Sequence, residues 1–98
     1  GGVDGVELLP FKRLKLATQR QRLNDGTYIH RGLGYSLGGE KNSIYGPRNS
    51  AFGHGGYGGS VGFADPKYKF AMALTKNHFS KDNTSVQIVN KVRELLNV

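Results

Sequence analysis

A histidine set in a run of glycines is the feature of this sequence that could most directly do chemistry. His54 lies in the segment Gly53-His54-Gly55-Gly56-Tyr57-Gly58-Gly59, and apolar residues bracket the run. Each glycine inside a regular element costs about 0.5–1 kcal/mol relative to alanine, so the run needs a reason. Glycine allows positive φ and close approach of a ligand to backbone N–H groups. We interpret the segment as the wall of a site, the alternative being a flexible glycine loop.

The other residues with chemical potential do not form a motif. Seven carboxylates are spread along the chain without a close pair, so paired-carboxylate catalysis has no support. His30, His54 and His78 are too far apart to indicate a metal site, and no glycine run carries the lysine and following helix of a phosphate-binding loop. The chain has no cysteine, which excludes thiol catalysis and disulfides. We therefore expect neither a metal nor a cofactor.

The first half of the chain predicts one helix and one strand. Good helix formers run from Phe11 to about Arg22 behind Pro10, which is tolerated in a first helical turn. The segment 24–26, Asn-Asp-Gly, predicts a turn. Residues 32–38 alternate and predict a strand with Leu33, Tyr35 and Leu37 on one face, followed by a surface loop over 39–49.

The second half predicts a hairpin covered by a helix. Extended structure resumes at 52–54, and Val61 and Phe63 lie two apart on the next strand. A turn at 64–69 leads to a strand over 70–75 whose small residues on one face would let a helix pack closely. The helix is expected to begin within 80–84 and to run towards residue 98, with one apolar stripe formed by Val86, Val89, Val92, Leu95 and Leu96. The predicted fold class is α/β (α+β), an antiparallel sheet packed by a C-terminal helix.

Three segments together resemble the serine β-lactamase-like hydrolases. They are L-G-Y-S-L-G-G at 33–39, F-G-H-G-G-Y-G-G-S-V-G-F-A-D-P at 52–66, and A-L-T-K-N at 73–77. This superfamily includes class C β-lactamases, D-alanyl-D-alanine carboxypeptidases and esterases of the same fold. The resemblance implies that residues 1–98 form the C-terminal segment of a single β-lactamase-like domain whose N-terminal portion is absent from this chain. The opening Gly1 to Gly5, which reads as a loop without an initiator Met, agrees with that expectation.

The resemblance also implies roles for the glycine run. By position, His54-Gly55-Gly56 matches the Lys-Thr-Gly motif, which lies on an inner strand facing the nucleophile. His54 would place a donor or a positive charge beside the acyl group, and Gly56 would keep the strand open. The backbone N–H of Tyr57 would be an oxyanion-hole donor, and Gly55 and Tyr57 would line the substrate-binding site. A tetrahedral intermediate requires such preorganised N–H donors, which bulky side chains would block.

Two departures from the family pattern shape the expected activity. Gly55 stands where Lys-Thr-Gly has a hydroxyl, which favours an esterase or peptidase over a true β-lactamase. Neither S-x-x-K nor Y-x-N or Y-x-S occurs, so this chain alone should be inactive. The expected function is part of a serine hydrolase that forms an acyl-enzyme with a small ester or amide and uses no cofactor. Its nucleophile would come from an upstream segment or a second chain.

Composition leaves two alternatives open. The net charge of +7 on 98 residues, enough for one small domain, is compatible with a basic module for RNA or anionic surfaces, although we expect nucleic acid not to be the partner. In that alternative Tyr28, Tyr35 and Tyr57 would stack on bases, and the charge would come from Lys12, Arg13, Lys15, Arg20 and Arg22. A catalytically inactive scaffold of the same family is the other alternative. No apolar run is long enough to predict a transmembrane segment.

Overall fold

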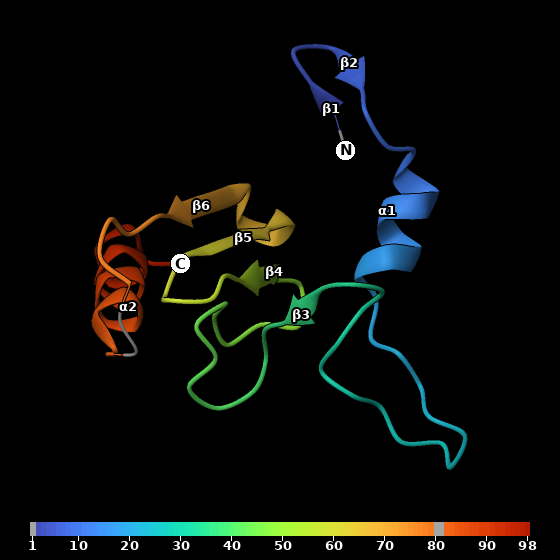
Figure 1. The fold of residues 1–98 in the computed structure, drawn as a ribbon. Coiled ribbons are helices and arrows are strands. Elements are labelled where there is room, and N and C mark those ends of the chain that lie inside the picture. The colour runs from blue at the N-terminus through green and yellow to red at the C-terminus, as the bar shows by residue number, and fades with distance from the viewer. Residues whose placement is uncertain (1, 80–81) are drawn as a thin grey trace.

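The structure is a computed structural model that describes residues 2–79 and 82–98. Its elements are two sheets and two helices, with a four-stranded antiparallel sheet at the centre (Figure 1). The smaller sheet pairs β1 (Gly2–Val3) with β2 (Val6–Glu7), and helix α1 (Phe11–Thr18) follows. The larger sheet has the order β3 (Ser36–Leu37), β4 (Phe52–Gly55), β5 (Val61–Asp65) and β6 (Phe70–Leu74), and helix α2 (Thr84–Leu96) comes last. The predicted α+β class is confirmed.

The hairpin of β5 and β6 holds the core. Val61 pairs with Leu74 and Phe63 pairs with Met72, so these side chains share one face of the sheet. Val61 and Phe63 are buried and pack with Val89 of α2, which is fully buried. We call this side the covered face. The turn between the strands, η1 (Pro66–Tyr68), confirms the predicted hairpin at Asp65-Pro66.

The opposite side of the sheet, the open face, has mostly small residues. By register it carries Phe52, His54, Gly62, Ala64, Ala71 and Ala73. The prediction that a helix packs on this face of β6 was wrong, because Val89 packs with the large side chains of the other face. The physical reason is that burying Val61, Phe63 and Met72 removes more apolar surface from water than burying alanines.

Helix α1 is shorter than predicted, because it ends at Thr18 and not near Arg22. The Thr18 hydroxyl donates to Leu14 O (2.8 Å), and Gln19 is extended. Beyond that point Gln21 N donates to Arg31 O (2.9 Å) and Ile29 N donates to Gln21 O (3.0 Å). Pairing between segments distant in sequence therefore overrides helix propensity here. The predicted turn at 24–26 is confirmed, with Gly26 at φ +91°.

The predicted strand over 32–38 is reduced to β3. Gly34 has φ +83°, which bends the chain and breaks the alternation before Tyr35. Leu33 is consequently exposed while Leu37 is buried, so the two do not share a face in the core.

The apolar stripe predicted for α2 is only partly buried. Val89 is buried and Val92 is half-buried, whereas Val86, Leu95 and Leu96 are exposed. The inward side instead includes Ser85, which is buried, and Arg93, which is half-buried. The helix stands at one end of the sheet, so only its middle turns reach the core (Figure 1). Of the cap candidates, residues 80 and 81 lie outside the described residues, and the helix begins after Asn83.

Candidate functional site

The structure places His54 on the open face, near the end of β4. Its cross-strand partner is Gly62 of β5, and His54 itself is exposed. A Cβ atom added to Gly62 would meet no atom within 4 Å. The imidazole therefore stands beside the bare backbone of Gly62.

One hydrogen bond determines how the His54 ring presents its nitrogens. His54 Nδ1 lies 2.6 Å from Gly55 O. Because a carbonyl oxygen only accepts, Nδ1 carries the hydrogen in this arrangement. The neutral ring then offers Nε2 as an acceptor, and only the imidazolium form donates from Nε2.

The turn after His54 presents Tyr57 at the surface. Gly56 N donates to Ser60 O (2.6 Å), which closes the turn. Tyr57 is 81% exposed, and its ring contacts Phe79 edge to face with centroids 4.8 Å apart. Gly58 has φ +93°, and a Cβ there would lie 2.5 Å from the Phe79 ring. Glycine at position 58 is thus required by the fold.

The glycines of the run therefore divide into two groups. Gly53, Gly58 and Gly59 have a close contact, a positive φ or both, so the fold itself accounts for them. Gly55 and Gly56 have ordinary φ and room for a Cβ, with nearest atoms at 3.9 Å and 3.4 Å. Among the described glycines, only these two and Gly62 lack any such requirement; Gly62 is the cross-strand partner of His54, and Gly55 and Gly56 follow it in the chain.

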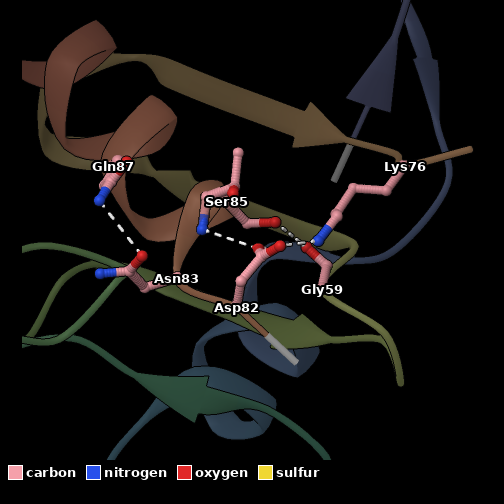
Figure 2. Close-up of polar contacts among 7 residues, drawn as sticks. Gly59, Lys76, Asp82, Asn83, Ser85 and Gln87 are labelled. Atoms are coloured by element: carbon pink, nitrogen blue, oxygen red, sulfur yellow. Dashed lines mark hydrogen bonds and ion pairs between the residues drawn. The ribbon is translucent and has the colours of Figure 1, made fainter. Parts of the chain in front are cut away.

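Polar contacts tie the glycine turn to the start of α2 (Figure 2). The Ser85 hydroxyl donates to Gly59 O at 2.5 Å. Lys76 Nζ lies 3.3 Å from Asp82 Oδ1, and the same oxygen accepts from Thr84 N (3.1 Å). A Cβ at Gly59 would lie 3.0 Å from both Lys76 Nζ and Ser85 Oγ. Helix α2 therefore holds the turn that carries Tyr57, a role for Ser85 that no motif in the sequence indicated.

A second polar cluster centres on Asp65, at the end of β5. Asp65 is 2% exposed and accepts from Arg48 Nε (2.6 Å), Ser50 Oγ (2.7 Å) and Lys67 N (3.2 Å). Burial alone would raise the pKa of Asp65, but the hydrogen bonds from Ser50, Arg48 and Lys67 and the charge of Arg48 together lower it. Arg48 also lies over the Tyr68 ring, 4.0 Å from its centroid. This cluster fastens the 39–50 loop to the sheet and is structural.

The main cavities lie away from His54. One of about 450 Å³ is lined by residues of 29–45, and one of about 500 Å³ lies between the 39–47 loop and α2. Neither is lined by His54, Gly55, Gly56 or Tyr57, which all lie on an open surface. Within residues 2–79 and 82–98 no three His, Asp or Glu side chains gather as a metal site would require. No helix in this part of the chain combines the length and apolarity of a membrane span.

Comparison with models of protein families, with curated proteins and with solved structures finds no match to this chain. Membership in the β-lactamase-like superfamily therefore stays a prediction, which depends on the motifs in the sequence.

Proposed function

We propose that this chain supplies one wall of a serine hydrolase active site. The observation that carries the proposal is Gly62, which the fold does not require and which lies beside the exposed His54 on the open face; Gly55 and Gly56, which the fold also does not require, follow His54 in the chain. Bare backbone beside an imidazole suits a substrate that must approach peptide N–H groups closely. The open face would be completed by the segment that carries the nucleophilic serine, from elsewhere in the polypeptide or from a second chain.

In the completed site, the serine hydroxyl gives its proton to a base supplied with the nucleophile, and its oxygen attacks the carbonyl carbon of an ester or amide to form a tetrahedral oxyanion. The oxyanion collapses, the base returns the proton to the leaving alcohol or amine, and water then hydrolyses the acyl-enzyme and restores the serine hydroxyl. The backbone N–H of Tyr57 donates to the oxyanion. His54, as imidazolium, donates from Nε2 to the substrate, because Nδ1 is engaged by Gly55 O. With no hydroxyl at Gly55, an esterase or peptidase is favoured over a β-lactamase.

Exposed apolar side chains support the need for a further segment. Leu95 of α2 and Phe11 of α1 are each 72% exposed. Both helices therefore leave large apolar side chains in contact with solvent, as surfaces that pack against further chain do. Such surface is consistent with packing against the remainder of the same domain.

The arrangement of the tyrosines gives less support to the alternative function, a basic module for RNA or anionic surfaces, than to the hydrolase. Arg20 and Arg22 lie 5.1 Å and 5.9 Å from the Tyr28 ring centroid, so guanidinium groups already occupy that ring. The segment 20–28 and the turn between β4 and β5 lie on opposite sides of the molecule (Figure 1). The proposed stacking groups therefore do not form one platform for a strand of bases.

Labelling with a fluorophosphonate tests the proposal on the protein expressed from its complete reading frame. We expect one serine to be labelled, located by mass spectrometry outside the 98 residues. We expect His54→Ala to lower kcat/KM for a nitrophenyl ester about 10²-fold with unchanged unfolding. Gly62→Leu should also lower it, because its side chain would cover the surface beside His54, whereas Gly62→Ala is the matched control.

Three results would each count against one part of the proposal. A label on a serine of this chain would refute a nucleophile supplied from elsewhere. Equal kcat/KM in the wild type and His54→Ala would refute the role of the imidazole. No labelling and no ester hydrolysis would leave the inactive scaffold as the better description.

A further inference from the structure

Arg93 is a partly buried cation with two donor atoms that have no partner in the part of the chain that the structure describes. It extends from α2 beneath the 39–47 loop, and its Nε and Nη1 atoms are buried. Neither atom has a hydrogen-bond partner among residues 2–79 and 82–98. Buried guanidinium donors nearly always find acceptors, so the Arg93 guanidinium lacks the acceptors that such a group ordinarily has.

The loop is shaped around the Arg93 guanidinium. Gly46 is buried with φ +105°, and a Cβ there would lie 2.5 Å from Arg93 Nη1. The backbone is held by Gly39 N, which donates to Gly46 O (3.0 Å). A side chain at position 46 would displace the arginine, so the glycine preserves its place.

The surroundings of Arg93 also disfavour its positive charge. Burial, followed by the positive charge of Arg48, lowers the pKa of Arg93. Arg48 itself is paired with Asp65 at 2.6 Å, and no salt bridge joins Arg93 to a carboxylate among residues 2–79 and 82–98. An anion beside Arg93 would relieve the repulsion between the two guanidinium groups.

A cavity of about 500 Å³ opens on this arginine. Its other lining residues include four with hydrogen-bond donors, Lys41, Asn42, Ser43 and Asn90, and one acidic residue, Glu40. We propose that this cavity binds a small-molecule oxyanion, a carboxylate or a phosphate, with Arg93 as its main ligand. A planar guanidinium binds both groups with two parallel hydrogen bonds. The inference is independent of the proposed hydrolase, because His54 does not line this cavity.

Anion titration of the chain tests the proposal by calorimetry at constant ionic strength. Inorganic phosphate and acetate are each titrated against sodium chloride, which separates a phosphate site from a carboxylate site. We expect saturable binding of at least one of the two oxyanions and a loss of at least tenfold in affinity for Arg93→Gln. Arg13→Gln, at an exposed position of α1, is the matched control and should bind as the wild type does.

If Arg93→Gln does not fold, Asn90→Ala replaces it as the test variant. We expect Asn90→Ala to weaken oxyanion binding severalfold. Glu40→Gln removes the competing carboxylate and should strengthen binding. Equal affinity in the wild type and Arg93→Gln, or no binding of either oxyanion by the wild type, would overturn the proposal. Binding seen only in Glu40→Gln would also overturn it, because Glu40 would then be the partner of Arg93.

Discussion

Two glycines on adjacent strands should respond oppositely to the same substitution. Gly53 of β4 lies against β5, where an added Cβ would overlap Gly62 O and lie 2.5 Å from Phe63 Cβ. Gly62 of β5 faces the other side, where nothing lies within 4 Å. We expect Gly53→Ala to lower the free energy of unfolding and Gly62→Ala to raise it.

The magnitudes follow from the contacts. Overpacking costs about 1–3 kcal/mol, and the close atoms at Gly53 belong largely to backbone that cannot rotate away. Replacing a glycine of ordinary φ gains about 0.4–1 kcal/mol, because the unfolded chain loses freedom. The two variants should therefore differ by about 1.5–4 kcal/mol. At roughly 4–8 °C per kcal/mol for a domain of this size, they should be well separated in Tm.

Thermal and urea unfolding followed by far-ultraviolet circular dichroism measures the difference, after gel filtration has established the oligomeric state of each variant. The wild type is the reference for both. A Gly53→Ala variant as stable as the wild type would refute the packing described for β4 against β5. A loss above 1 kcal/mol in Gly62→Ala would show that the face beside His54 is closed and would also weaken the proposed site.

Three further predictions concern the polar clusters and α2. Asp65→Asn should lower the free energy of unfolding by about 3 kcal/mol at neutral pH, because it leaves Arg48 without its buried partner. Since the pKa of Asp65 is lowered in the folded state, its stabilisation is present above the unfolded value of about 3.9 and is lost as pH falls through the folded pKa. Urea unfolding between pH 7 and pH 2 should therefore show a flatter acid dependence in the variant. Ser85→Ala should cost about 1–2 kcal/mol and speed hydrogen exchange at residues 56–60, since Gly59 O loses its donor; unchanged exchange there would contradict the link between α2 and the turn. Leu95→Lys should change the free energy of unfolding by less than about 0.5 kcal/mol, because the side chain is exposed, and a larger loss in urea unfolding would mean that Leu95 is packed.

The surroundings of His54 could be only partly foreseen from the sequence. The glycine run indicated an unusual backbone conformation, but it could not show which glycines the fold itself requires. That distinction depends on neighbours from other segments, such as Phe79 at Gly58 and Phe63 at Gly53. Ser85 and Arg93 were missed for the same reason, since a serine or arginine on an amphipathic helix ordinarily faces solvent.

Local sequence determined the hairpin at Asp65-Pro66, the turn at 24–26 and the α+β class, because φ preferences and alternation act between near neighbours. Tertiary structure decided where α1 ends, which side of the sheet α2 covers and which glycines are free to serve a ligand. Those outcomes depend on contacts between distant segments, where buried apolar area and backbone pairing outweigh the small local propensities. The periodicity of α2 thus predicted a helix, but the sheet determined that Val89 is buried and Leu95 is not.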